Sequence, residues 1–342
     1  MQRRKAGPQG MVFGGIMAGL ILLCALVPFL SIFMPVPLVL VYVRYGGRTA
    51  TMTAIVASLL TAMFTGVVQA FLLTVPVGIL PGLAFGCGFR HKLRPMLIGI
   101  IAILTFFLAW SANYVVTRTL VLGGQDPIVQ MVESEEAKSA FKTLFGAFAQ
   151  ALEQTPPRND AEAQVRAAQV AQFREFGEHP ATLYWALLPT ILLIGGAFNT
   201  WLNYMLCRTV LPRFGHEVPA PTPFSRFTLP VWMVWAFALF YLPSAYAAGM
   251  ILNAPWWATI LINLGTLLQA VFMLYGLAVA YGYLRIKQEM GKVGAVMWSI
   301  VPLFFMGMYG TMIYSMVGMA DAIFDFRGLG HGLWKLPPEE TP

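Results

Sequence analysis

The feature that most constrains this chain is a series of nine apolar segments, most of them near the length of about 20 residues at which an α-helix crosses a hydrocarbon layer. Only 11% of the residues are charged and the mean hydropathy is +0.69, whereas about a quarter of the residues are charged in soluble domains. Backbone groups inside lipid must be hydrogen-bonded within the chain, so we expect these segments to be helices. The sequence therefore predicts an all-α integral membrane protein, a polytopic helical bundle of eight or nine transmembrane segments.

The apolar segments fall into two blocks on either side of one long polar stretch. They cover residues 11–33, 35–45, 49–69, 71–89, 96–117, 183–206, 229–250, 256–284 and 294–320. We therefore divide the chain into an N-terminal transmembrane block (1–120), a polar helical insert (121–180), a C-terminal transmembrane block (181–320) and a tail (321–342).

The distribution of charge predicts an orientation. If the N-terminus is cytoplasmic, the inward-facing connections carry 14 Lys and Arg residues and two acidic residues. The outward-facing connections then carry 8 basic and 13 acidic residues. The positive-inside rule selects this arrangement, which places the 121–180 insert outside the cytoplasm. The net charge of +7 thus indicates membrane topology and lipid contact, and nucleic acid is not an expected partner.

The second apolar segment, residues 35–45, is too short for a perpendicular span. It begins with Pro35-Val36-Pro37 and ends beside Arg44. A half-helix or re-entrant element would be tolerated only inside the protein or along a cavity. Such interrupted segments are a pointer to a transport site, but no matching segment occurs in the other half. Whether residues 35–45 span decides on which side the C-terminus lies, and the sequence leaves this open.

The insert is expected to form two amphipathic helices. Ser134 is a suitable N-cap for a helix that ends before Thr155-Pro156-Pro157, and a second one-sided pattern runs from Asp160 to Gly177. Such an extracytoplasmic amphipathic helical hairpin can cover helix ends, close over a substrate, or bind a partner.

Several classes of chemistry are disfavoured. No P-loop, H-E-x-x-H or G-x-S-x-G motif occurs, and the first eight apolar segments have no Asp or Glu in their middles. The three cysteines and four histidines show no metal-ligand spacing. We therefore expect no enzyme activity, no cofactor and no metal site, and any energy for transport must come from another protein.

Uncharged polar side chains inside the apolar segments remain as candidate ligand contacts. If two of these segments meet below the insert, the candidate ligand-binding residues are Trp110, Asn113, Asn199 and Asn203. Asn199 and Asn203 are four residues apart and share one helix face. Hydrogen bonding between helices is the alternative for each of them.

Two further patterns each have a structural and a functional interpretation. Gly14 with Ala18 and Gly15 with Gly19 form small-x-x-x-small pairs, which suit either internal packing or contact with a partner helix. At the membrane boundary, two carboxylates and a guanidinium would gather in the cluster of Asp321, Asp325 and Arg327. This cluster would be either an ion pair that anchors the chain end, or a polar gate or partner contact.

The chain resembles the YybS-like family of bacterial polytopic membrane proteins of unknown function. The resemblance rests on Pro35-Val36-Pro37-Leu38, on Arg44-Tyr45-Gly46 and on the Asp321 to Arg327 stretch. It covers the first five and the last four apolar segments, but not the insert in detail. This family is similar in turn to the S components of energy-coupling-factor transporters, although nine segments exceed their usual six.

The resemblance implies a location, a ligand and a partner. It implies a bacterial cytoplasmic (inner) membrane, a small-molecule ligand held near the outer side, and a first helix that docks on a transmembrane coupling protein with separate ATPases. The expected function is therefore a solute-binding or translocating subunit without its own ATPase. The alternative is a membrane scaffold or assembly protein that binds other membrane proteins through the insert and the C-terminal motif, and a lipid-handling enzyme or flippase is a third class. Fold analogy alone does not decide between them.

Overall fold

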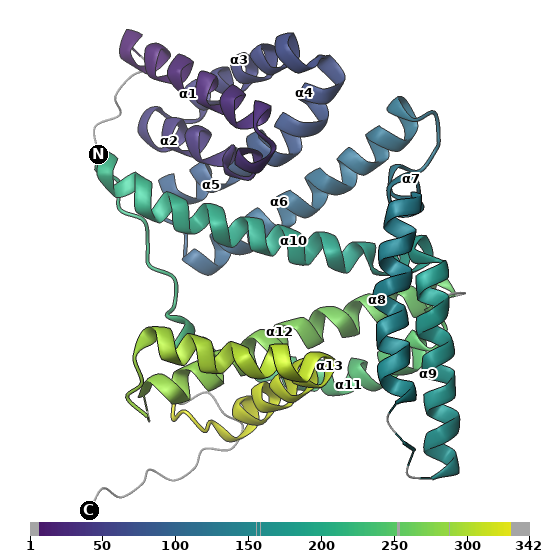
Figure 1. Cartoon of the computed structure of the whole chain (residues 1–342). Coiled ribbons are helices and arrows are strands. Elements are labelled where there is room, and N and C mark those ends of the chain that lie inside the picture. Colours follow the sequence, from purple (N-terminus) through teal and green to yellow (C-terminus); the bar gives the residue numbers. More distant parts are fainter. Residues whose placement is uncertain (1–6, 155, 158, 252–253, 287, 330–342) are drawn as a thin grey trace, which may run out of the picture. The chain divides into compact units, whose positions relative to one another are not determined.

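The computed structural model of the chain describes residues 7–154, 156–157, 159–251, 254–286 and 288–329, and all regular elements in these ranges are helical (Figure 1). The basic residues at positions 3–5 and the predicted tail beyond residue 329 lie outside these ranges. The elements are α1 (Pro8–Leu26), η1 (Pro28–Phe33), α2 (Pro35–Tyr45), α3 (Gly47–Thr65), α4 (Val67–Leu73), η2 (Thr74–Ile79), α5 (Leu80–Arg90), α6 (Pro95–Val116), η3 (Thr117–Val121), α7 (Pro127–Val132), α8 (Glu135–Glu153), α9 (Asp160–Glu178), α10 (Pro180–Val210), η4 (Leu211–Phe214), η5 (Phe224–Arg226), α11 (Trp232–Ala248), α12 (Trp256–Ile286) and α13 (Lys292–Phe324).

Every predicted apolar segment coincides with helix, so the all-helical class is confirmed. Within the described residues, five helical stretches are long and apolar enough to cross a membrane: Pro8–Leu26, Gly47–Thr65, Pro95–Val121, Pro180–Phe214 and Trp256–Ile286. Four shorter apolar helices are Phe29–Tyr45, Thr74–Arg90, Trp232–Ala248 and Lys292–Leu303. Five of the predicted spans are thereby supported, and spanning by the other four remains a prediction.

The chain divides into two compact units. Unit 1 comprises Met1–Ala181 and Ile191–Pro221, and unit 2 comprises Thr182–Thr190 and Thr222–Pro342. The division falls within α10, which contains a proline at position 189. Contacts therefore group the predicted N-terminal block, the insert and most of α10 together.

Small residues hold α1 against α3 in unit 1. Ala18 and Ala25 of α1 are buried in one cluster with Ala50, Ala54 and Ala57 of α3. Alanines allow two helix backbones to approach closely, which is the packing that helices use in lipid. The N-terminal block therefore has a tightly packed core.

The helices α2 and α5 also pack closely. A Cβ atom added at Gly86 of α5 would lie 2.5 Å from Cβ of Tyr42 on α2. Gly82 is similarly tight, since an added Cβ would lie 3.0 Å from the carbonyl oxygen of Pro35. The glycines of this segment thus let the short helix α2 lie within the unit, with Val36, Leu38 and other apolar side chains buried.

The helices α6 and α10 run antiparallel where they meet in unit 1. Gly196 of α10 lies against Phe106 of α6, since an added Cβ would be 3.3 Å from Cβ of Phe106. Ile98, earlier on α6, shares a buried cluster with Tyr204 and Cys207, later on α10. Earlier residues of α6 therefore lie beside later residues of α10, so the two helices run in opposite directions.

Unit 2 is built around α12, which packs against both α11 and α13. Gly276 of α12 lies against the carbonyl group of Tyr314 on α13, and Gly318 of α13 lies against the backbone of Phe272 on α12. The ring of Phe237 on α11 lies tilted against that of Phe272, with ring centroids 4.7 Å apart. Glycine-mediated backbone contact thus sets the spacing of the two longest helices in this unit.

The insert contains the helix pair α8–α9, whose members lie side by side (Figure 1). Ser134 caps α8 by accepting a hydrogen bond from the backbone N–H of Ala137, and Asn159 caps α9 in the same way. Phe145 of α8 contacts Phe173 and Phe176 of α9. The helix α9 ends at Glu178, one residue after the predicted end at Gly177, and this glycine packs on the backbone of Lys142.

Candidate functional site

Among the amide side chains that the structure describes in unit 1, the most deeply buried belongs to Asn203 on α10, which is 0% exposed. Its Nδ2 donates to the carbonyl oxygen of Ile32 in η1 at 3.0 Å and to that of Asn199 at 2.9 Å. Its Oδ1 is shielded from solvent and has no hydrogen-bond partner in the described part of the chain. Asn203 thus joins α10 to η1 with its donors and leaves an acceptor free.

A break in helix geometry lies beside η1. Residues Thr74–Ile79 form the π-helical turn η2, which contacts η1 and contains Pro76 and Gly78. Thr74, at the start of this turn, is 0% exposed, and its Oγ1 has no partner among the described residues. π-Helical turns occur frequently at functional sites. The element that contacts Asn203 therefore also contacts an interrupted helix with a free hydroxyl.

A second free hydroxyl lies one turn before Asn203. Thr200 is 5% exposed, and its Oγ1 has no partner within the described ranges. Residues three apart share a helix face, so Thr200 and Asn203 present two polar groups to the same side of α10. A buried polar atom without a hydrogen bond costs roughly 1–3 kcal/mol, so such atoms normally find water or a ligand. We refer to Thr74, Thr200 and Asn203 as the polar cluster of unit 1, because Asn203 bonds to η1, Thr200 shares its helix face, and Thr74 begins the turn that contacts η1.

The sequence-predicted ligand residues occupy different environments. Trp110 is 38% exposed, and Asn113 is half-buried with an unpartnered Oδ1. Nδ2 of Asn199 donates to the carbonyl oxygen of Gly195, 3.0 Å away on its own helix. Of the four predicted residues, only Asn203 belongs to the polar cluster.

The antiparallel packing of α6 and α10 keeps Asn113 away from Asn203. Asn113 follows Phe106 by seven residues, and Asn203 follows Gly196 by seven residues in the opposite direction. At 1.5 Å per residue, this places the two amides about 20 Å apart along the pair. The two segments pack together at Phe106 and Gly196, but this packing does not bring Asn113 and Asn203 together. A ligand-binding role for Trp110, Asn113 and Asn199 stays a prediction.

The two small-residue pairs of α1 face different surroundings. Gly14 and Ala18 are buried, and an added Cβ at Gly14 would lie 2.6 Å from Oγ1 of Thr53 on α3. Gly15 and Gly19 are exposed, with no atom within 4 Å of an added Cβ. The first pair thus packs internally, and contact with a partner helix stays a prediction for the second.

The structure brings Asp321 and Arg327 together in unit 2. Oδ2 of Asp321 lies 2.9 Å from Nη2 of Arg327 and accepts a 2.8 Å hydrogen bond from the hydroxyl of Tyr275. The guanidinium also donates to the carbonyl oxygens of Ser225 and Phe227. These contacts anchor the chain after α13 to the segment around η5.

Asp325 has a local role in the same stretch. It ends α13 in the left-handed conformation, with φ at 49°, and its Oδ1 accepts from the backbone N–H of Leu329 at 2.9 Å. The predicted cluster is therefore a buried pair of Asp321 and Arg327 followed by a helix cap.

Asn263 shows the alternative interpretation of an intramembrane amide. In unit 2, its Oδ1 accepts from Oγ1 of Thr190 at 2.8 Å, and its Nδ2 donates to the carbonyl oxygens of Ala186 and Thr259. Both ends of the amide are satisfied by protein groups. Asn263 thus joins two helices and differs from Asn203, which retains a free acceptor.

No pattern in the sequence predicts a site role for Thr74 or Thr200. Threonine is common in membrane helices, where its hydroxyl bonds to the preceding turn, as Thr61 does by donating to Ala57. Pro76 and Gly78, which closely follow Thr74, weaken an α-helix and could have indicated an irregular segment there. No comparable signal marks Thr200.

Titratable chemistry is sparse near the polar cluster. Its three side chains are uncharged, and the described residues contain no group of three or more His, Cys, Asp or Glu side chains able to hold a metal ion. Outside the candidate spans, His216 has a lowered pKa because burial disfavours its charged form and Arg44 repels a second positive charge. The uncharged side chains of the polar cluster therefore suit hydrogen bonding to a neutral group.

A family model described as a predicted membrane protein (DUF2232) matches residues 15–322. No curated protein and no solved structure matches the chain.

Proposed function

The chain belongs to the DUF2232 family of predicted membrane proteins, and from this premise we propose that it is a solute-binding or translocating subunit of a transporter without its own ATPase. The observation that carries the proposal is the polar cluster of Thr74, Thr200 and Asn203, which leaves buried hydrogen-bonding atoms free beside an interrupted helix. In transporters, irregular helices inside the protein supply the polar groups that hold a substrate.

The chemistry of the polar cluster indicates the class of solute. Oδ1 of Asn203 can only accept a hydrogen bond, whereas the hydroxyls of Thr74 and Thr200 can donate or accept. A neutral molecule with hydroxyl or N–H groups satisfies all three atoms without placing an unpaired charge in the membrane. We therefore propose a neutral polar solute and no enzymatic step.

A separate coupling protein is part of this proposal. The exposed pair Gly15 and Gly19 lies on α1, a candidate span, beside exposed Ile16 and Leu23. Glycines four residues apart allow another helix to approach closely. We propose that a transmembrane protein linked to ATPases binds here, in a bacterial cytoplasmic membrane with the N-terminus inside and the pair α8–α9 outside.

The scaffold alternative is less well supported. A scaffold would bind other proteins partly through the C-terminal motif. In the structure, however, the side chains of Asp321 and Arg327 are 1% and 3% exposed and bond to each other within the chain. A scaffold would also give no role to the free acceptor of Asn203. We therefore favour the solute-binding function.

Native mass spectrometry of protein purified gently from its own membranes tests the proposal. We expect a small neutral molecule to remain bound to the wild-type protein and to be lost from Asn203→Ala and Thr200→Val. The matched control is Thr61→Val, because Thr61 is equally buried but its hydroxyl already donates to Ala57. Retention of the molecule in all variants, or its absence from the wild type, would contradict the proposal.

A further inference from the structure

The helix pair α8–α9 contains two adjoining cavities of about 410 Å³ and 330 Å³. Both are lined by Ala171 and Arg174, so they form one groove along α9. Small side chains make up much of its floor, including Ala163 and Ala167 at one end and Gly146 at the other. The small residues leave room for a bound group between charged rims.

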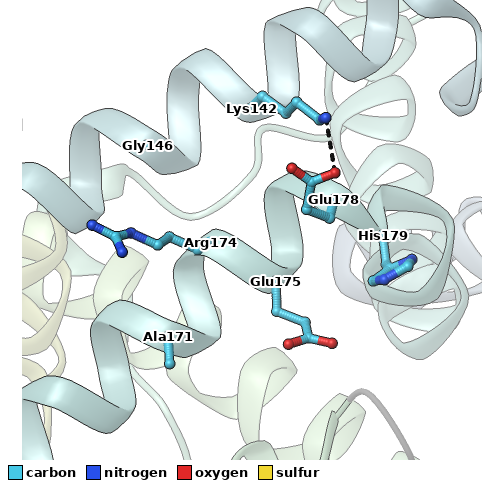
Figure 2. A pocket seen from close by; sticks show the side chains of 7 residues that line it. All are labelled: Lys142, Gly146, Ala171, Arg174, Glu175, Glu178 and His179. Atoms are coloured by element: carbon cyan, nitrogen blue, oxygen red, sulfur yellow. Dashed lines mark ion pairs between the residues drawn. The ribbon is translucent and has the colours of Figure 1, made fainter.

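The charged side chains at the first end are partly paired with one another. Figure 2 shows Lys142 of α8 directed toward Glu178 of α9, with 2.8 Å between Nζ and Oε2. In the same view Glu175 points away from α8. At the junction of the two cavities, Nη2 of Arg174 lies 2.6 Å from Oε1 of Glu153. Each of these acids is exposed or already close to a cation.

Arg166 differs from the other cations of the groove. Its Nη2 donates to Oε1 of Glu162 at 2.7 Å, but its Nη1 is shielded from solvent and has no partner among the described residues. The side chain is only 15% exposed. A guanidinium nitrogen without an acceptor is costly to bury, and oxygens of an anion are its natural partners.

We propose that this groove binds a phosphate group through Arg166, with Arg174 as the second cation of the same cavity. Arginine forks match phosphate oxygens, and Glu153 and Glu162 each engage one nitrogen of a guanidinium while leaving other donors available. The phosphate belongs either to a soluble molecule or to a lipid headgroup. This site is independent of the polar cluster and of the solute proposed to bind there.

Isothermal titration calorimetry of the full chain in neutral detergent, at fixed ionic strength, tests the site. The two probes are inorganic phosphate and a short-chain, water-soluble phosphatidylglycerol. We expect at least one probe to bind at a single site, and Arg166→Gln to weaken it by about tenfold or more through loss of a charge-assisted hydrogen bond. Lys138→Gln is the matched control, because it removes the same charge from α8 outside the groove.

A second variant covers the case in which Arg166→Gln fails to fold. Ala167→Trp fills the groove from an exposed position without removing a charge, and we expect it to weaken binding equally. Tighter binding of inorganic phosphate identifies a soluble source, and tighter binding of the lipid identifies a headgroup. No binding of either probe, or wild-type affinity in both groove variants, would overturn the site. Asn203→Ala should bind both probes normally, which separates this test from that of the proposed function.

Discussion

The carboxylate of Asp321 and the guanidinium of Arg327 form a buried ion pair, with Oδ2 and Nη2 2.9 Å apart and both side chains at most 3% exposed. Nε of Arg327 also donates to Oδ2, and the guanidinium lies over the ring of Tyr275, 5.1 Å from its centroid. All these groups belong to unit 2. A charge pair this well satisfied acts as a fixed link between the end of α13 and the segment before α11.

Removing one member of this pair should destabilise unit 2 strongly. Asp321→Asn leaves the Arg327 cation buried without its counter-ion, and we expect a loss of about 3–5 kcal/mol in the free energy of unfolding. Arg327→Met should have a similar effect. In the double variant both charges are gone, so the loss should be smaller than the sum of the two single losses. Thermal and denaturant unfolding of the purified variants in detergent measures this, and strictly additive losses would contradict the pairing.

Backbone contact between α12 and α13 makes Gly276 sensitive to substitution. Gly276→Ala would push a methyl group into the carbonyl of Tyr314, which cannot rotate away as a side chain could. We expect a loss of about 3 kcal/mol from this overpacking. Gly195→Ala is the control, since its added Cβ meets nothing within 4 Å. Equal unfolding temperatures for the two variants would show that the helices are not this close.

The positions of helices follow from the sequence far better than their contacts do. Apolar length identifies the long helices of the two transmembrane blocks, a one-sided pattern identifies α8 and α9, and the short α2 is marked by Pro35 and Pro37. Besides Asp321, which the sequence does predict, the side chains of Asn203 and Arg327 bond to backbone carbonyls as many as 171 residues away. Every residue has a backbone carbonyl, so no side-chain pattern predicts which carbonyl accepts these bonds. Which amide has a free acceptor is therefore a property of packing alone.

The free hydroxyl of Thr74 predicts an unusual stability effect. Thr74→Val replaces a buried, unpartnered Oγ1 with a methyl group of similar size, so the ligand-free protein should gain roughly 1–3 kcal/mol. Thr61→Val removes a hydroxyl that already donates to Ala57, so its effect should be smaller or of opposite sign. Unfolding temperatures of both variants, freed of bound small molecules, provide the measurement. A destabilised Thr74→Val would mean that its hydroxyl is hydrogen-bonded in the folded protein.

The adjacent glycines Gly14 and Gly15 offer a matched test of α1. Gly14→Ala should lower stability by about 1–3 kcal/mol, because its methyl group meets Thr53 on α3. Gly15→Ala should change stability by at most about 0.5 kcal/mol. It should, however, reduce co-purification of a transmembrane partner, since it adds bulk to the exposed small-residue face. Unfolding and quantitative pull-down from native membranes distinguish these effects, and an unchanged yield of partner in Gly15→Ala would contradict a docking role.

His216 should make the stability of unit 1 depend on pH. Its pKa in the folded chain is lowered from the ordinary value of 6.5 because burial disfavours the imidazolium and Arg44 repels it. The unfolded chain therefore binds a proton more readily below pH 6.5, so stability is fully present above that pH and falls as the solution is acidified toward the folded-state pKa. His216→Gln cannot be protonated and should lose less stability between pH 7.5 and about 5.5. Unfolding temperatures of the two proteins across this range test the sign, and parallel pH profiles would remove His216 as a cause of acid destabilisation.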